Sequence, residues 1–278
     1  MKIMLTPHEI ERYQRQLSLD GFDEAAQERL KDSAALVAGV GGLGGAAALY
    51  LAAAGIGRLA LIHEGQLETA DLNRQALMTS ERIGQSRVVQ AKETIKNFNP
   101  HIEIDIFDEP IKPERLQSVI PDVDIVIDAQ HNFPERRLIN NACVEAGKPM
   151  IEAAMNGMEG YLFSVIPNET ACLHCLYPED PEWAPFGFPV LGAVSGVFGC
   201  LAAIEAIKIV SGFQEPFLNT LIHFDMARME LKKFKIHKQE DCALCGHRTG
   251  GDKPRPCLQD THVSARMQAN VSAESISL

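Results

Sequence analysis

Short apolar runs alternate with longer segments of helical period along most of the chain. The runs predict strands at residues 34–40, 58–63, 101–107, 123–128, 150–154 and 160–166. Helices are predicted directly after the first run and at residues 87–97, 116–119 and 135–146. Strands that alternate with helices indicate an α/β fold with a Rossmann-like, doubly wound sheet. We expect this sheet to be mainly parallel, with residues 160–166 as an antiparallel extension.

Two further helices are predicted before the first strand, and they form an N-terminal helical arm over residues 1–32. Thr6 is the expected N-cap of the first helix, with Pro7 at the first helical position and Glu9 completing a capping box. Arg12 and Arg15 lie three residues apart and would share one face of this helix. Exposed arginines most often serve as solvated charge, so their spacing alone favours that interpretation over phosphate binding. The second helix is expected at residues 21–31.

A cluster of glycines follows the first predicted strand and opens the helix behind it. Gly39, Gly41 and Gly44 match the G-x-G-x-x-G pattern of nucleotide-binding turns, and Gly42 and Gly45 also lack a side chain. Free amides at a helix N-terminus, together with the positive end of the helix dipole, favour phosphate binding. The alternative is a closely packed strand-to-helix turn that holds no ligand.

The ends of the second and fourth predicted strands are candidates for further contacts to a nucleotide. An acid at the end of the second strand usually accepts hydrogen bonds from ribose hydroxyls, but this chain has His63 followed by Glu64. Glu64 is expected to point to the opposite side of the strand. Residues 130–133 would form the loop at the carboxyl end of the fourth strand, where ligands of open parallel sheets bind. Residues 71–77 are expected to form a polar loop, unsuited to a buried element.

Length and composition fit one large domain over residues 1–248. The 278 residues are 46% hydrophobic, and the polar segment 249–278 is expected to be a disordered tail. The formal net charge of −11 argues against binding to nucleic acid or to anionic membranes, because both rely on basic surface. The apolar stretch 190–210 contains Glu205 and Lys208, so a buried core helix explains it better than a membrane span. The first residues turn polar too soon for a secretory signal, and we expect a cytoplasmic protein.

Four of the seven cysteines form two C-x-x-C pairs, Cys172 with Cys175 and Cys242 with Cys245. Four thiolates complete the tetrahedron that a structural Zn²⁺ prefers, and they leave no position open for water or substrate. The pattern therefore predicts a zinc site that pins the C-terminal segment to the body of the domain. A redox C-x-x-C is the alternative, which the second pair disfavours. His174 is expected to be exposed rather than a ligand.

Together these motifs resemble the ThiF/MoeB/HesA family of ubiquitin-activating-like adenylyltransferases, most closely its HesA branch, which is associated with nitrogen fixation. The resemblance covers about residues 5–246 and rests on residues 12–16, 39–44, 73–75, 99–100, 128–132 and 157–160 and on the paired cysteines. It implies a homodimer of ThiF/MoeB-like adenylation domains that binds ATP at the glycine turn. It also implies that the C-terminal carboxylate of a ubiquitin-like carrier protein attacks the α-phosphate, giving an acyl-adenylate and pyrophosphate.

The resemblance also assigns roles to single residues. Arg74 matches the family's phosphate-binding arginine, Arg15 matches the arginine supplied by the partner subunit, and Arg87 stands where lysine is usual. His63 replaces the ribose-binding aspartate, and His131 replaces the aspartate that holds Mg²⁺.

A neutral imidazole is a poor ligand for Mg²⁺, so the metal bridge is either rebuilt from Asp128 or absent. Asp71 replaces the usual asparagine. Catalysis would fall to Arg74, Arg15, Arg87 and His131. The expected nucleotide contacts are Gly39, Gly41, Gly42, Gly44, His63, Glu64, Asn73, Arg74, Gln75, Arg87, Asp128, His131 and Asn132.

Two functions of different classes follow from these expectations. The first is an ATP-dependent nucleotidyltransferase that activates a carrier-protein carboxylate or a metal oxyanion such as molybdate. The second is a non-catalytic accessory protein that binds a nucleotide or an oxyanion and docks onto nitrogenase assembly proteins. The HesA resemblance implies a role in nitrogenase cofactor or molybdenum supply in either case, and we favour the enzyme. An NAD-dependent oxidoreductase is disfavoured, because a catalytic acid–base constellation and a ribose acid are both missing from the expected places.

Overall fold

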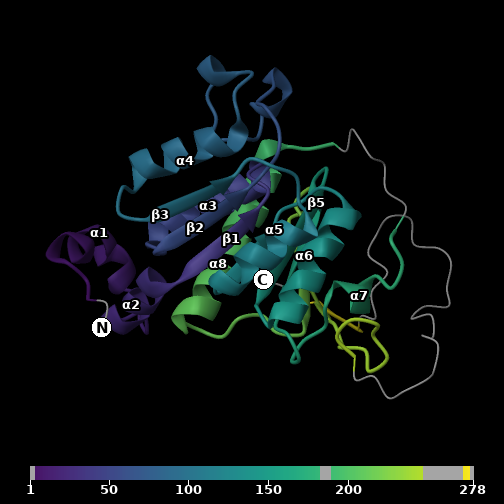
Figure 1. Ribbon diagram of the computed structural model, residues 1–278. Coiled ribbons are helices and arrows are strands. Elements are labelled where there is room, and N and C mark those ends of the chain that lie inside the picture. Colours follow the sequence, from purple (N-terminus) through teal and green to yellow (C-terminus); the bar gives the residue numbers. More distant parts are fainter. Residues whose placement is uncertain (1–3, 182–188, 247–271, 276–278) are drawn as a thin grey trace.

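A computed structural model describes residues 4–181, 189–246 and 272–275 (Figure 1). Its strands form one sheet in the order β3-β2-β1-β4-β5-β6-β7-β8-β9. The first five in this order pair in parallel: β3 (Glu103–Phe107), β2 (Arg58–Ile62), β1 (Ala34–Ala38), β4 (Ile125–Asp128) and β5 (Met150–Asn156). The others pair antiparallel: β6 (Glu159–Val165), β7 (Thr220–Asp225), β8 (Glu230–Lys235) and β9 (Ser272–Ser275). The predicted doubly wound α/β sheet with an antiparallel extension is confirmed.

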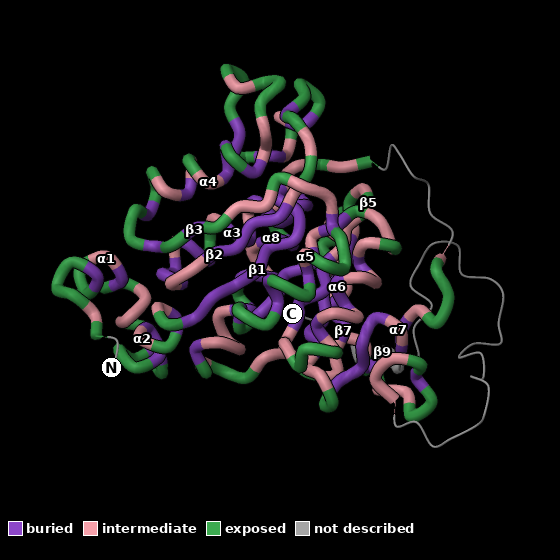
Figure 2. Tube along the Cα trace, viewed as in Figure 1, coloured by how far each residue is buried: buried purple, intermediate pink, exposed green. Residues whose placement is uncertain are grey.

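Helices cover both faces of this sheet. One core includes residues of α3 (Gly42–Ala54), α4 (Arg87–Phe98) and α8 (Gly192–Ser211), and the other includes residues of α5 (Pro113–Val119), α6 (Phe133–Ala146) and α7 (Leu173–Leu176). Successive side chains of a strand point to opposite faces, so on β1 Val37 joins the first core and Leu36 the second. As a result β1 is buried along its whole length (Figure 2). Three short 3₁₀ helices complete the connections: η1 (Thr69–Asp71), η2 (Ser80–Arg82) and η3 (Ile120–Asp122).

The strand order changes direction at β1, because β2 lies on one side of it and β4 on the other. Ligands of open α/β sheets bind at the carboxyl ends of the strands that flank such a point. The loops after β1 and β4 meet there, and the Ala129 N–H donates to the Ala38 carbonyl at 2.9 Å. The end of β2 lies alongside, because the Gly39 N–H donates to the Ile62 carbonyl at 2.8 Å.

The N-terminal arm consists of α1 (Pro7–Leu17) and α2 (Glu24–Asp32). The predicted capping box is confirmed: the Glu9 N–H donates to Thr6 Oγ1 at 3.3 Å, and the Thr6 N–H donates to Glu9 Oε2 at 2.8 Å. The second helix begins three residues later than predicted, because Asp23 is its N-cap. Gln16 Nε2 donates to the Ala54 carbonyl at 3.0 Å, so α1 docks at the C-terminal end of α3.

The 20-residue helix α8 is the one helix of the described residues that is long and apolar enough to cross a membrane. Its residues Phe198, Ala202 and Ala206 are buried in the core that α3 also lines, as expected of a core helix. Of the tail that we expect to be disordered, residues 272–275 form β9 and the others lie outside the described residues.

Candidate functional site

The glycine turn lies between β1 and α3, at the carboxyl edge of the sheet. Gly39 has a φ of +99°, which L side chains rarely adopt, and this residue makes the turn. A Cβ on Gly44 would lie 1.8 Å from the Gly39 carbonyl oxygen, so the helix could not pack here with a side chain. A Cβ on Gly41 would meet no atom within 4 Å. The space beside Gly41 at the start of α3 is therefore open, and an anionic ligand there could meet the free amides of the helix N-terminus.

Two arginines are held near this turn by one buried acid. Asp71 Oδ1 accepts a hydrogen bond from Arg74 Nη2 at 3.0 Å, and Asp71 Oδ2 lies 3.7 Å from Arg87 Nη1. Asp71 Oδ2 also accepts from the Glu68 N–H at 3.0 Å. Asp71 is 6% exposed, so the expectation that this segment is unsuited to burial is wrong here. Arg74, Arg87 and Asp71 together carry a formal charge of +1, and the contacts with Asp71 hold the two guanidinium groups in place.

The neighbours of Arg74 complete this side of the site. Arg74 Nη1 donates to Asn73 Oδ1 at 2.9 Å, and Asn73 is exposed. Gln75 is buried, and its Oε1 has no partner among the described residues. A Cβ on Gly42 would lie 3.1 Å from Arg74 Cβ, which places the arginine against the first turn of α3.

His63 directly follows β2, and its ring atom Nε2 is buried without a hydrogen-bond partner in the described part of the chain. Burial first, and then the Arg87 guanidinium and His131, lower the pKa of His63 to about 3. The ring is therefore neutral at physiological pH. Glu64 is exposed, and its carbonyl accepts from Arg87 Nη2 at 2.9 Å.

The last residue of β4 and the loop after it hold three of the predicted contacts, and they differ in what they offer a ligand. Asp128 is fully buried, and its Oδ1 accepts from the Gln130 N–H at 2.9 Å. Asn132 is the N-cap of α6, because its Oδ1 accepts from the Glu135 N–H at 2.9 Å. His131 is exposed. Mg²⁺ prefers oxygen ligands, but His131 offers only nitrogen and the Asp128 carboxyl group is fully buried. The described residues here therefore do not fit a carboxylate-bound Mg²⁺ in this arrangement.

Asp128 belongs instead to a buried polar cluster on the α6 side of the sheet. Asp128 and Glu152 are partners in the β4–β5 register, and they therefore point to the same face. Glu152 Oε1 pairs with Arg136 Nη1 and accepts from the Tyr161 hydroxyl at 3.4 Å. Burial, and then the neighbouring Glu152 carboxylate, hold the pKa of Asp128 well above its ordinary value. A proton held by Asp128 at this raised pKa leaves one guanidinium, that of Arg136, to balance one carboxylate.

This cluster also fixes the loop that carries His131. Arg136 Nη2 donates to the Gln130 carbonyl, while Asp128 accepts the Gln130 N–H. Both main-chain groups of Gln130 are therefore bound. The sequence-based prediction did not include Glu152 and Arg136. The signal that could have found this cluster is an acid in each of two otherwise apolar strands, Asp128 in β4 and Glu152 in β5.

The two cysteine pairs come together, one at the start of α7 and the other beyond β8. Their four sulfur atoms lie within 4.8 Å of one another. Cys172 Sγ lies 3.7 Å from Cys242 Sγ, and Cys175 Sγ lies 3.4 Å from Cys245 Sγ. Sulfurs bound to Zn²⁺ at about 2.3 Å in a tetrahedron are about 3.8 Å apart. The cluster therefore fits a structural zinc ion, and the sequence prediction of its ligands agrees with the geometry.

His174 lies between the first pair of cysteines and makes other contacts. Its Nε2 is 3.0 Å from Asn141 Oδ1 and its Nδ1 is 2.8 Å from Arg137 Nη1. It is half-buried, so the expectation of an exposed ring is wrong, although it is not a member of the sulfur cluster.

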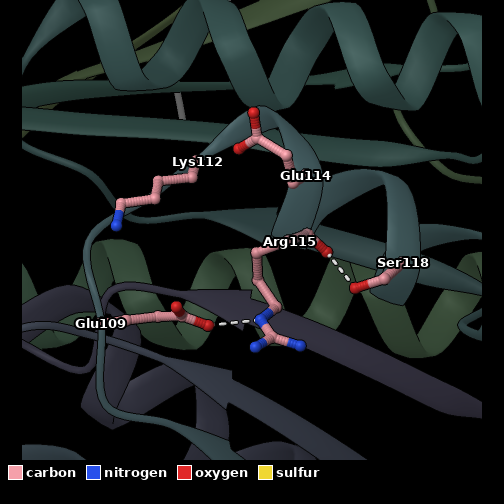
Figure 3. Close-up of a pocket in the computed structure, with 5 residues that line it drawn as sticks. All are labelled: Glu109, Lys112, Glu114, Arg115 and Ser118. Carbon is pink, nitrogen blue, oxygen red and sulfur yellow. Dashed lines mark hydrogen bonds and ion pairs between the residues drawn. The ribbon is translucent and has the colours of Figure 1, made fainter.

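A separate hollow of about 270 Å³ lies beside α5 and is lined by Glu109, Lys112, Glu114, Arg115 and Ser118 (Figure 3). Arg115 pairs with Glu109, and its guanidinium lies 4.6 Å from the centre of the Phe107 ring. The charge of Arg115 is thus satisfied internally, and this hollow shares no residue with the glycine turn.

Arg15 does not join the site of its own chain. It is exposed on α1, next to the C-terminal end of α3, whereas the glycine turn lies at the N-terminal end of that helix. The 13 residues of α3 span about 20 Å. A role of Arg15 at the phosphates therefore requires a second copy of the chain, as the resemblance implies.

Sequence comparison finds a family model and relatives that cover most of this chain. The model of the ThiF family matches residues 13–244. Protein HesA of Leptolyngbya boryana is 52% identical over 243 residues, which cover 87% of this chain and 88% of that protein. The adenylyltransferase and sulfurtransferase MOCS3 of Arabidopsis thaliana is 36% identical over 90% of this chain and 55% of that protein.

Solved structures share the fold. Escherichia coli MccB with ATP superposes with a TM-score of 0.73 at 26% identity, over 80% of this chain and 68% of that one. The microcin C7 biosynthetic enzyme MccB in complex with N-formylated MccA gives a TM-score of 0.79 at 24% identity, over 87% and 77% of the two chains. The chain belongs to the ThiF family and has its adenylyltransferase fold.

Proposed function

We propose that this chain binds ATP at the glycine turn and adenylates a carboxylate, that of the C-terminal residue of a ubiquitin-like carrier protein. The observation that carries the proposal is the open N-terminus of α3 at Gly41, next to the arginines that Asp71 fixes. MOCS3 is an adenylyltransferase by name, and MccB has been crystallised with ATP on the same fold, which supports the assignment. We place the protein in the cytoplasm, as a homodimer.

The proposed reaction joins two anions. A carboxylate oxygen attacks the α-phosphorus, the bond from that phosphorus to the bridging oxygen breaks, and pyrophosphate leaves as the acyl-adenylate forms. The reactants repel each other until positive groups offset their charge. In this proposal the amides of α3, Arg74 and Arg87 supply that charge, and Arg15 of the partner subunit adds to it. No general base is required, because the carboxylate is already ionised at neutral pH, and a neutral His63 is compatible with this chemistry.

One observation favours a second function. The places where the family resemblance puts carboxylates for ribose and Mg²⁺ hold His63 and His131, and Asp128 is buried. These departures fit an accessory protein that binds a nucleotide, or an oxyanion such as molybdate, without turning it over. Such a protein would dock onto nitrogenase assembly proteins and support cofactor supply.

Pyrophosphate exchange separates the two functions. The protein is mixed with ATP, Mg²⁺, labelled pyrophosphate and candidate carrier proteins, and label that enters ATP supports adenylation. ATP binding without exchange for any carrier supports the accessory function, and AMP released only with molybdate supports oxyanion activation. If the wild-type protein binds ATP with a dissociation constant above about 1 mM, the proposal of an ATP-dependent enzyme is refuted.

Arg74→Ala tests the seat of the phosphates. Loss of a charged hydrogen bond costs about 1.5–3 kcal/mol, so ATP affinity should fall by about 10- to 150-fold while the protein stays folded. Arg58→Ala is the matched control, because Arg58 begins β2 at the opposite edge of the sheet and pairs with Asp105 at 3.1 Å. Unchanged affinity in Arg74→Ala would show that the phosphates bind elsewhere.

A further inference from the structure

The residue that follows β2 is placed to contact the sugar of a bound nucleotide. β2 lies next to β1, and the Ile62 carbonyl accepts a hydrogen bond from the Gly39 N–H at the glycine turn. Leu61 points into the core that α3 and α4 also line, so the side chain of His63, two residues on, lies on that same side. The acid that reads ribose hydroxyls in dinucleotide-binding folds occupies this place.

His63 offers less to a ribose than an acid would. A carboxylate has two oxygens and accepts hydrogen bonds from both hydroxyls at once, whereas a neutral imidazole has one acceptor nitrogen. Because burial, Arg87 and His131 lower the pKa of His63 to about 3, the ring carries no charge that would strengthen such a bond. Its buried Nε2 has no partner among the described residues.

The acids nearby do not take the place of the missing carboxylate. Asp71 is bound to Arg74 and to the Glu68 N–H, with Arg87 close by. Asp108 follows β3, which lies on the far side of β2 from the glycine turn. Glu64 is exposed and is expected on the opposite side of the strand.

We propose that His63 makes the nucleotide site indifferent to the ribose hydroxyls, so that ATP and its 2′-deoxy and 3′-deoxy analogues bind with similar affinity. This inference rests on the proposed nucleotide-binding function and concerns the specificity of the same site.

Titration calorimetry of the whole chain with ATP, 2′-deoxyATP and 3′-deoxyATP, each with Mg²⁺, tests the proposal. The three wild-type dissociation constants should agree within about threefold, at pH 6 as at pH 8. His63→Asp should prefer ATP over each analogue by about tenfold or more, because a charged acceptor is restored. His101→Asp makes the same change at an exposed histidine at the opposite edge of the sheet, before β3, and should keep the wild-type ratios.

His63→Asn covers the case in which the aspartate variant fails to fold, because an amide is uncharged and should keep ratios near those of the wild type. A wild-type preference for ATP above about threefold overturns the inference, as does a folded His63→Asp with unchanged ratios. In both results ATP still binds, so the proposed function stands. Failure of all three nucleotides to bind overturns the proposed function and this inference with it.

Discussion

Arg136→Met should destabilise the protein by an amount that grows with pH. The substitution removes the guanidinium that balances Glu152 and leaves Glu152 and Asp128 as two buried acids without a cation. Removal of one partner of a buried ion pair typically costs about 3–5 kcal/mol, and we expect this range at pH 7.

The pH dependence follows from proton binding. A buried acid with a raised pKa holds a proton in the folded chain that it loses on unfolding, so stability falls as pH rises from the unfolded pKa of about 4 towards the folded one. In the wild type this applies to Asp128, whose pKa is raised. In the variant we expect Glu152, which has lost its cation, to hold a proton in the folded chain as well. One extra proton steepens the slope by about 1.4 kcal/mol per pH unit, so the cost of the substitution should rise by about 2.7 kcal/mol between pH 6 and pH 8.

Urea unfolding followed by circular dichroism at pH 6, 7 and 8, at fixed zinc and protein concentrations, measures this cost. Arg58→Met is the control, because a surface pair contributes about 0–1 kcal/mol and its loss should not depend on pH in this range. Asp128→Asn is the complementary variant. Its amide replaces the protonated acid, and its stability relative to the wild type should rise with pH. A cost of Arg136→Met below about 1 kcal/mol, or a cost that is the same at every pH, would refute this account of how Arg136 balances the buried acids.

The remaining predictions concern zinc, the dimer and His131. Cys242→Ser should lose most of its zinc by elemental analysis and melt at a lower temperature, whereas Cys200→Ser, outside the sulfur cluster, should keep its metal; full zinc in Cys242→Ser would contradict the four-thiolate site. Arg15→Ala and Arg74→Ala should each be inactive in exchange, but an equal mixture should recover about a quarter of the wild-type sites, because only mixed dimers contain an intact one. No recovery would exclude a role of Arg15 across the dimer. His131→Asp should raise pyrophosphate exchange by about tenfold or more through an added oxygen ligand for Mg²⁺, and unchanged exchange would show that Mg²⁺ at this position is not limiting.

The sequence predicts the features that depend on local pattern. Apolar runs identify the central strands, because strands buried on both faces need nearly continuous apolar side chains. Gly39 and Gly44 are recognisable because the turn and the close helix contact exclude a Cβ. The cysteine pairs are equally easy to recognise, because C-x-x-C spacing lets both sulfurs of a pair bind the same metal ion.

Features that depend on pairing across the fold are less predictable. Asp71 lies in a polar segment, and only the folded chain shows that two arginines and a main-chain amide compensate its burial. Asp128 could be placed at the end of a strand, but its partner Glu152 depends on the register of β4 with β5. The pKa of His63 likewise depends on burial in the folded chain and then on two neighbours from other segments, Arg87 and His131.

The sulfur cluster can form only late in the synthesis of the chain. Cys172 and Cys242 are 70 positions apart, so a ribosome releases the first pair well before the second. The strands β1 to β6 are complete before either pair emerges, and they have the opportunity to fold without metal. The four-cysteine cluster can assemble only after Cys245 has left the exit tunnel, so a metal ion held by all four sulfurs would enter after most of the sheet has been made.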